Sequence, residues 1–479
     1  MIAAPLCVMT HRRRPSWIIA LAVTWTTFGI SWGILQRVLA EGVVTYYVGG
    51  WVPPLGIELR VEPVNAFVLL IVSGISAIVL WAAPQSFNQE IPNNRHHLAY
   101  AAFLLCMTGL LGMTSAGDAF NIFVFLEISS LSAYSLIAMG PHRRALTASF
   151  RYLMMGTTGG TFILLGIGLL YMTTGTLNIA ELQEQLQGVG GQRTVLVAMA
   201  CIVVGASIKL ALLPLGAWLP NAYMFAPSVV TAFLAATATK VAYYVLVRFL
   251  FRVFGADLAF GRLNLDQIFL PLAIFSMFLA SILAILESDV KRLLAYSSLS
   301  QIGYMVLGLS LASVHGLTGG IVHLWNHALM KSGLFLVMAC VALRLGSTRL
   351  DAMRGIGRRM PFTMAAFVVA GLSMIGVPLT VGFVSKWYLV LAALEQGLWL
   401  IAALILASSL LAVIYIWKVV EVAYFREPPE DAPALEEAPL SMLVPTWVLT
   451  GATLYFGVFT DLSVGVASRA AEILMGVAG

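Results

Sequence analysis

The sequence predicts an all-α protein that crosses a membrane about fourteen times, at roughly 34 residues for each helix and its loop, in one membrane domain over residues 1–479. Hydrophobic residues make up 60% of the chain and charged residues 10%, whereas soluble domains are about 45–50% apolar and 25% charged. Apolar segments also recur at lengths near the ~20 residues that a spanning helix needs. These observations exclude a soluble globular protein. The net charge of +5 therefore bears on membrane orientation rather than on a nucleic-acid partner.

Thirteen segments are apolar and long enough to span a bilayer: Trp17–Leu39, Val64–Trp81, Leu98–Thr114, Phe120–Met139, Phe150–Thr173, Thr194–Trp218, Ser228–Phe251, Ile268–Leu286, Val290–Ser310, Leu317–Leu343, Phe362–Ala393, Trp399–Val422 and Leu440–Thr460. Met1–Thr10 is apolar too, but as a helix it reaches only about 15 Å, half of a hydrocarbon core of ~30 Å. It predicts half a helix. Because the charges of HRRRP follow this segment rather than precede it, we expect no cleavable signal peptide.

Basic residues mark the cytoplasmic loops of membrane proteins, and here they gather in alternate loops. One set of loops holds Arg60, Arg193, Arg252 and Arg262. The other holds Arg12, Arg13, Arg14, Arg95, Arg143, Arg144, Lys291, Arg292, Arg344, Arg349, Arg354, Arg358, Arg359 and Arg426. This asymmetry predicts that the second set is cytoplasmic, in a cell (inner) membrane, with the C-terminus outside. The last cytoplasmic loop, residues 427–439, is acidic and proline-rich and is expected to be a flexible linker.

Two spans contain an internal proline, Pro214 and Pro378. A proline within a helix frees the carbonyl four residues back, here at Leu210 and Met374. Broken helices at membrane depth are tolerated where they line a cavity, and interruptions at matching places indicate an internal repeat. Since the two spans lie five apart, two five-helix units of opposite topology are expected, over residues 98–251 and 268–422. The alternative is a kinked structural helix.

Seven ionisable residues within the spans are the candidate functional residues: Glu127, Lys209, Lys240, His323, His327, Lys331 and Lys386. The five that are not histidines would cost about 15 kcal/mol if unpaired, at roughly 3 kcal/mol for each central charge. Chance tolerance of charged residues in the membrane does not explain a free-energy cost of this size.

Glu127 has no nearby basic residue in its own helix, so its partner must come from another helix. Lys209 lies in the span that Pro214 interrupts, and Lys240 lies in the next span. A Glu–Lys pair would hold both charges in a low dielectric, whereas two lysines close together would lower each other's pKa. A buried lysine can therefore change charge near neutral pH, as a proton relay requires. The alternative for any one of them is an ion pair that only fixes helix packing.

His323, His327 and Lys331 stand four residues apart, so they advance only 40° at each step and form one stripe about 12 Å long. A stripe of titratable groups suits proton transfer. A zinc pair on one helix is an alternative, although no third ligand is apparent, and so is a pair of histidines that are simply hydrogen-bonded to neighbouring helices. Lys386 follows the break at Pro378.

The four cysteines, Cys7, Cys106, Cys201 and Cys340, form no CxxC pair, which argues against iron–sulfur clusters, c-type haem and structural zinc. No nucleotide, flavin or metal site is apparent, so no cofactor is expected. Hydroxyl groups at Tyr296, Ser297, Ser298 and Ser300 could support ordered water, but serines in spanning helices more often only aid packing.

Six stretches in order resemble the proton-conducting antiporter-like family shared by multi-subunit Mrp cation/proton antiporters, respiratory complex I and membrane-bound hydrogenases: GDAFNIFVFLEISSLSAYSL, SIKLALLPLGAWLPNAY, TATKVAYYVL, ESDVKRLLAYSSLSQIGYM, HLWNHALMKSGLFL and GVPLTVGFVSKWYL. The resemblance covers nearly the whole chain. It implies fourteen helices, two inverted five-helix repeats, broken seventh and twelfth helices, and a central hydrophilic axis.

The resemblance also implies roles for the candidate residues. Glu127 and Lys209 would be the coupling pair, Lys240 with the His323, His327 and Lys331 stripe would be the relay, and Lys386 would be the terminal proton station. The lysine at position 386 and the segment GGWVPPLGIELRVEPVNAF are most similar to the D-type branch of the Mrp antiporter proteins. The implied partners are other membrane subunits of such an assembly, with protons and Na⁺ or K⁺ as the transported ions.

Three alternatives stay open. The chain could be a proton-pumping subunit of a complex I-like or hydrogenase complex, with no catalytic redox site of its own. It could be a stand-alone transporter of an organic solute, which would not need a run of lysines and histidines between repeats. A scaffold subunit is disfavoured by the cost of its buried charges.

Overall fold

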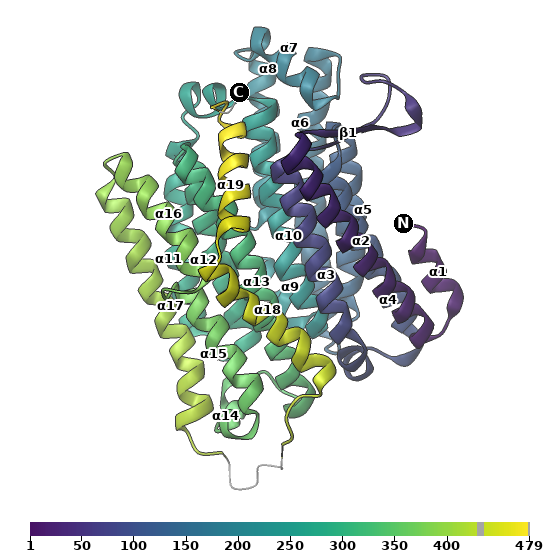
Figure 1. The fold of residues 1–479 in the computed structure, drawn as a ribbon, viewed down its shortest axis with the longest axis vertical. Helices are drawn as coiled ribbons and strands as arrows, with labels where there is room; N and C mark the ends of the chain where they lie inside the picture. Colours follow the sequence, from purple (N-terminus) through teal and green to yellow (C-terminus); the bar gives the residue numbers. More distant parts are fainter. Residues whose placement is uncertain (429–434, 478–479) are drawn as a thin grey trace.

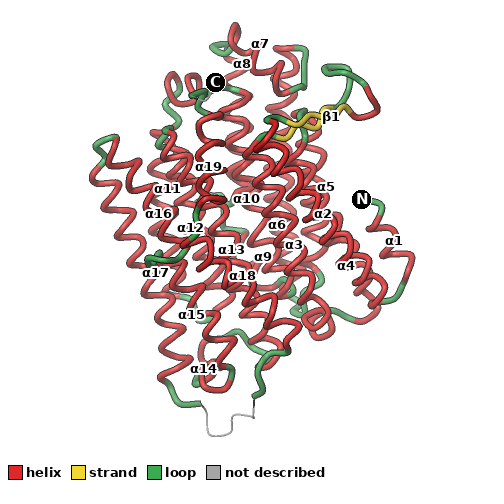
Figure 2. Tube along the Cα trace, in the orientation of Figure 1, coloured by secondary structure: helices red, strands yellow, loops and turns green. Residues whose placement is uncertain are grey.

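The computed structural model describes residues 1–428 and 435–477 and confirms the predicted all-α membrane fold (Figures 1 and 2). Long helices run roughly side by side along the vertical axis of Figure 1. In the described part of the chain, eleven helices are long and apolar enough to cross a membrane.

The uninterrupted long helices match the predicted spans: α2 (Arg13–Glu41), α3 (Pro63–Glu90), α4 (His96–Ser115), α5 (Ala119–Ala138), α6 (Arg144–Thr174), α10 (Ser228–Arg248), α11 (Asp266–Leu286), α12 (Val290–Ser310), α13 (Val314–Leu345), α17 (Trp399–Phe425) and α18 (Leu440–Val458). The predicted half helix is α1 (Ala3–Thr10), which packs against α2 and α4.

Both predicted breaks are present. In the sixth predicted span, α8 (Arg193–Leu210) ends four residues before Pro214, and a second helix, α9 (Leu219–Phe225), begins just beyond the predicted end at Trp218. The eleventh predicted span divides into α15 (Pro361–Ile375) and α16 (Val381–Glu395). α15 ends at Gly376, whose φ of +93° lies in the left-handed region that glycine adopts without steric cost. The prolines therefore interrupt these helices where the sequence indicates.

Further elements lie outside the predicted spans, except that the turn Phe249–Val253 overlaps the end of Ser228–Phe251. They are the antiparallel strands β1 (Val44–Tyr47) and β2 (Glu58–Val61), the helices α7 (Ile179–Val189), α14 (Ile356–Arg359) and α19 (Asp461–Leu474), and the short helical turns η1 (Val48–Gly50), η2 (Asn93–Arg95), η3 (Phe249–Val253), η4 (Asp257–Arg262) and η5 (Leu350–Met353). The hairpin and α7 lie at the upper end of the bundle in Figure 2.

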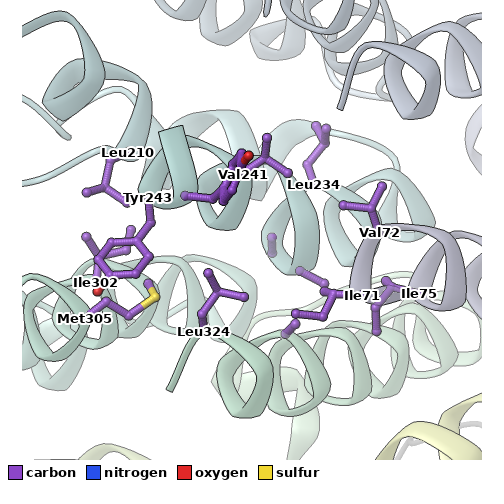
Figure 3. Packing of buried hydrophobic residues seen from close by; sticks show 14 of the residues in the cluster. Ile71, Val72, Ile75, Leu210, Leu234, Val241, Tyr243, Ile302, Met305 and Leu324 are labelled. Carbon is purple, nitrogen blue, oxygen red and sulfur yellow. The ribbon is translucent and has the colours of Figure 1, made fainter. Parts of the chain in front are cut away.

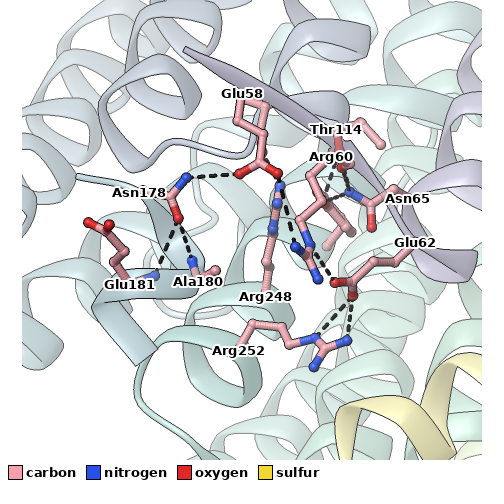
Figure 4. A network of polar contacts seen from close by, with 12 residues as sticks. Glu58, Arg60, Glu62, Asn65, Thr114, Asn178, Ala180, Glu181, Arg248 and Arg252 are labelled. Carbon is pink, nitrogen blue, oxygen red and sulfur yellow. Dashed lines mark hydrogen bonds and ion pairs between the residues drawn. The ribbon is translucent and has the colours of Figure 1, made fainter. Parts of the chain in front are cut away.

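A polar network joins the loops at this upper end (Figure 4). Asn178, which precedes α7, donates to Glu58 of β2 at 2.8 Å, and the Glu62 carboxylate accepts from Arg252 at 2.6 Å. Arg248, at the end of α10, donates to the carbonyl of Ala116 after α4. Alternate loops therefore meet at one end of the bundle, whereas α14 and the basic loops lie at the other (Figure 1).

The acidic loop differs in part from the expected flexible linker. Residues 429–434 lie outside the described residues, but Glu437 is anchored. Its carbonyl accepts from Arg344 Nε at 3.0 Å, and its carboxylate accepts from the backbone N–H of Phe362 at 2.9 Å, at the start of α15. A carboxylate at a helix N-terminus is electrostatically favourable, which explains the attachment.

α13 lies at the centre of the bundle and packs against α10, α12, α15, α16, α18 and α19. Apolar side chains of α3, α10, α12 and α13 interdigitate around it, among them Ile71, Leu234, Met305 and Leu324 (Figure 3). Polar groups on α13 are thereby removed from the lipid-facing surface, which is the condition for ionisable residues at membrane depth.

Candidate functional site

Glu127 of α5 and Lys209 of α8 face each other across a helix interface. Lys209 Nζ lies 3.7 Å from Glu127 Oε1 and donates a hydrogen bond to Ser130 Oγ at 2.8 Å. Since 3.7 Å exceeds the usual hydrogen-bond range of about 2.7–3.2 Å, the pair is held by charge attraction rather than by a direct hydrogen bond. The Lys209 side chain is 6% exposed and that of Glu127 is 25% exposed. The carboxylate can therefore be reached from the surface of α5.

Gly160 of α6 makes room for this carboxylate. A Cβ atom at position 160 would lie 2.3 Å from Glu127 Oε1. Any larger residue would force the carboxylate to move, so the position of Glu127 depends on this glycine.

The first break places Lys209 in the last turn of α8. A positive charge is favourable at a helix C-terminus. Trp218 lies just before α9, and its indole N–H donates to the carbonyl of Ile208 at 3.1 Å. The Trp218 side chain thus bridges the break between α8 and α9, and Lys209 lies beside this hydrogen bond.

Lys240 of α10 is fully buried. Its ammonium donates to the carbonyl of Ala235 and to Thr239 Oγ1, the latter at 3.3 Å. These partners are neutral oxygens, so the charge is solvated by the helix itself.

The stripe on α13 is fully buried at His323, His327 and Lys331. Lys331 Nζ donates to the carbonyl of Leu294 at 2.8 Å and to Ser297 Oγ. The two imidazole rings stack with centroids 6.0 Å apart, and within the described residues both nitrogens of His327 and Nε2 of His323 have no hydrogen-bond partner. Buried polar atoms of this kind are costly unless water or a proton carrier satisfies them.

Lys386 of α16 is held by the second break. Its ammonium donates to the carbonyls of Met374 and Ile375 at 3.1 and 2.7 Å, where α15 ends. It also lies 5.0 Å from the centre of the Tyr304 ring. The carbonyl that Pro378 was expected to free at Met374 is therefore used to bind this lysine.

The structure brings Lys240, the stripe and Lys386 together but leaves Lys209 apart. Ser385, next to Lys386, hydrogen-bonds His323 Nδ1 at 2.9 Å, and α10, which carries Lys240, packs against α13, which carries the stripe. No direct contact joins Lys209 to Lys240 in the described part of the chain. The two lysines belong to adjacent elements, because α8 packs against α10.

Three tyrosines on the neighbouring helices α5, α6 and α9 were not found by sequence reasoning. The rings of Tyr134 and Tyr152 lie 4.6 Å apart, and the Tyr152 ring stacks on Trp218 with ring centres 3.9 Å apart. The Tyr223 hydroxyl donates to the carbonyl of Leu234 at 3.2 Å, on α10, the helix that carries Lys240. A tyrosine in a spanning segment looks like any other aromatic core residue, so the sequence carries no signal for these positions.

The sequence favours only a packing role for Ser297, whereas in the structure its hydroxyl accepts a hydrogen bond from Lys331. Within residues 1–428 and 435–477, no group of three or more His, Cys, Asp or Glu side chains could hold a metal ion.

The model of the family described as NADH:quinone oxidoreductase/Mrp antiporter, transmembrane, matches residues 116–412, a range that contains all seven candidate residues. The chain belongs to this family. It is a polytopic protein of the cell membrane, and the resemblance drawn from the six sequence stretches is confirmed.

The individual relatives include an NADH-quinone oxidoreductase protein and a Na(+)/H(+) antiporter protein. The chain is 42% identical over 470 residues to NADH-quinone oxidoreductase subunit N of Desulforudis audaxviator, covering 93% of this chain and 92% of that protein. It is 30% identical over 421 residues to the D-type subunit of the Na(+)/H(+) antiporter of Alkalihalophilus pseudofirmus, covering 88% and 84%. The structure of the Mrp complex from a Dietzia species contains a chain that superposes with a TM-score of 0.91 at 26% identity, covering 99% of this chain and 95% of that one.

Proposed function

We propose that this chain is the proton-translocating, antiporter-like subunit of a multi-subunit Mrp-type monovalent cation/proton antiporter. The observation that carries the proposal is the series of titratable side chains from Glu127 to Lys386, in which the lysines are buried and donate to neutral oxygens. Other membrane subunits are its partners. The partial exposure of Glu127 supports this, because a neighbouring chain can reach the carboxylate.

The mechanism that fits this geometry is charge switching. At ~4 Å and an effective dielectric constant of 20, the Glu127–Lys209 attraction is worth about 4 kcal/mol. Moving the carboxylate away from Lys209 removes this stabilisation, so the lysine releases its proton more readily. The proton then passes toward Lys240, along the α13 stripe, and on to Lys386.

We also propose that residues 98–251 and 268–422 are two inverted five-helix repeats. Each unit contains one broken helix, and each break holds a lysine: Lys209 in the first unit and Lys386 in the second. Two equivalent half-routes, joined by Lys240 and the stripe, would span the membrane.

A second candidate function is a proton-pumping subunit of a redox-driven complex. The observation that favours it is the 42% identity to an NADH-quinone oxidoreductase subunit N, against 30% to the D-type antiporter protein. Both functions use the same axis and differ in the energy source.

The test is proton movement by the complete complex, purified with its partner chains and reconstituted in liposomes containing a pH indicator. An imposed Na⁺ or K⁺ gradient should drive proton movement without an electron donor. Movement that requires a reduced donor and a quinone would establish the second candidate instead.

A variant of the relay tests the axis in the same assay. Lys331→Arg keeps the charge but cannot release a proton, so the rate should fall by about 10²-fold. The control is Lys418→Arg, because Lys418 of α17 binds the carbonyls of Ile285 and Glu287, each at 2.8 Å, outside the axis. A wild-type rate for Lys331→Arg would refute the relay.

A further inference from the structure

Lys291 is a buried lysine that the proposed axis does not use. It lies in the first turn of α12 and is 5% exposed. Its ammonium donates to the carbonyl of Ala226 at 2.9 Å and to Ser228 Oγ at 3.4 Å. A positive charge is unfavourable both at a helix N-terminus and in a buried position, so this lysine requires a reason.

Ser228 links Lys291 to a carboxylate. Ser228 Oγ donates to Glu90 Oε1 at 2.7 Å, and its backbone N–H donates to Glu90 Oε2 at 2.8 Å. The hydroxyl therefore accepts from Lys291 while it donates to Glu90. If Lys291 passes one proton to the hydroxyl and the hydroxyl passes its own to Glu90, the lysine loses one proton, the carboxylate gains one, and the serine is unchanged.

These groups line a cavity at the end of the bundle that carries the basic loops. Its volume is about 420 Å³, and its lining includes Glu90, Ser228 and Lys291 together with the exposed residues His142 and Arg349. Since one water takes up about 30 Å³, the space holds several waters in contact with the surface loops.

α12 connects Lys291 to the proposed axis. Leu294 and Ser297 follow Lys291 by about one and two turns of α12, a rise of about 4.5 and 9 Å along the helix axis. These two residues are the hydrogen-bond partners of Lys331. Lys291 therefore lies on the same short segment of α12 to which Lys331 is hydrogen-bonded.

We propose that this cavity is the water-filled vestibule through which the axis exchanges protons with the basic side, and that Lys291, Ser228 and Glu90 relay them between the vestibule and Lys331. The inference rests on the proposed function, because it requires that Lys331 carries protons.

A purely structural role makes a different prediction. Lys291 binds the carbonyl that follows α9, and for that purpose any fixed positive charge suffices. Lys418 binds the carbonyls at the end of α11 in the same way and serves as the matched control. Lys418→Arg should be active, whereas Lys291→Arg should be inactive, because arginine does not release its proton.

The decisive experiment replaces Lys291 by cysteine in the assembled complex and modifies it in everted vesicles. The four native cysteines are buried and serve as the unmodified background. Lys291→Cys should lower the transport rate about 10²-fold. Aminoethyl methanethiosulfonate, which restores a titratable amine, should recover most of the rate, whereas the trimethylammonium reagent, which adds a fixed charge, should not.

Equal recovery with both reagents would show that only charge is needed, and failure of the introduced thiol to react would show that water does not reach it. Either result overturns the proposal. If Lys291→Cys does not assemble, Ser228→Ala replaces it, because it keeps the backbone N–H to Glu90 and removes only the hydroxyl. Ser228→Ala should lower the rate about tenfold, since water replaces a hydroxyl only in part, and an unchanged rate contradicts the relay.

The Lys331→Arg variant separates the two proposals. If Lys331→Arg is inactive and Lys291→Arg is fully active, the vestibule relay is wrong and the axis stands. If both arginine variants are fully active, the proposed axis itself is wrong.

Discussion

At the residue scale, Lys386 shows how a lysine is held at membrane depth by neutral groups. The second helix break leaves the carbonyls of Met374 and Ile375 without helical partners, and Lys386 donates to both. The same proline that breaks the helix thus creates the binding site for the charge. Under the proposed mechanism, this position requires a titratable group beside the break rather than a particular charge.

The activity of Lys386 variants should therefore depend on whether the new side chain can take up and release a proton, rather than on its charge. Lys386→Glu should keep part of the activity, because a buried carboxylic acid also takes up and releases protons near neutral pH. Lys386→Ala and Lys386→Arg should each lose most of it, by about 10²-fold, since neither can exchange a proton. The rates are measured in assembled complexes. Equal activity of the arginine and glutamate variants would show that Lys386 is not a proton station.

A glycine next to the proposed coupling pair, Glu127 and Lys209, gives a second prediction. Gly160→Ala places a Cβ 2.3 Å from Glu127 Oε1, so the carboxylate must move relative to Lys209, and transport should fall several-fold without loss of assembly. Gly168→Ala on the same helix is the control, because a Cβ there meets nothing within 4 Å. If both variants transport like the wild type, the position of the carboxylate does not control the rate.

At the scale of elements, the sequence predicts the spanning helices and both breaks, but not what lies between them. Long apolar segments and internal prolines are local signals, so α8 and α15 end where Pro214 and Pro378 indicate. The β1–β2 hairpin, α7 and α19 are short and mixed in polarity, and they are stabilised by contacts with distant residues, such as Asn178 with Glu58.

The same reason explains which site residues were missed. The sequence predicts that Lys291 is a charged loop residue at the start of a span. It is buried only because the connection between α9 and α10 folds over it, through Ala226 and Ser228. Side chains whose role depends on such long-range packing leave no pattern in the sequence.

The polar network at the hairpin predicts a pH-dependent stability. Burial raises the pKa of Glu62, but Arg252 and Arg60 outweigh it and hold this pKa below its usual value. The ion pair therefore stabilises the fold above the usual carboxyl pKa, near 4.3, and this contribution is lost as the pH falls through the lowered pKa.

Arg252→Gln should destabilise the complex by about 1–3 kcal/mol at pH 7, since it removes a partner of a buried carboxylate, and the difference should shrink in acid. Thermal unfolding of the purified complex as a function of pH measures this. Arg262→Gln is the control, because both side chains of its ion pair with Asp257 are largely exposed, at 68% and 82%, and such pairs contribute little. A constant difference between wild type and Arg252→Gln at all pH values would contradict the role of Glu62.

At the scale of the whole molecule, the charge of the loops predicts the orientation in the membrane. The loop that contains Ser347 lies at the basic end and the hairpin that contains Thr45 lies at the other, so single cysteines there should report opposite sides. An impermeant thiol reagent applied to intact cells should label Thr45→Cys and spare Ser347→Cys. The reverse pattern would invert the topology.

The central claim is that Glu127 and Lys209 couple proton movement rather than only hold two helices together. The most direct measurement is cation-driven proton movement in vesicles that contain the assembled complex with both residues replaced, Glu127→Gln and Lys209→Met. Apolar or neutral replacement of a buried pair is often tolerated structurally, so the double variant should assemble. The proposed mechanism predicts that it assembles and does not transport; an assembled double variant with wild-type transport would contradict it.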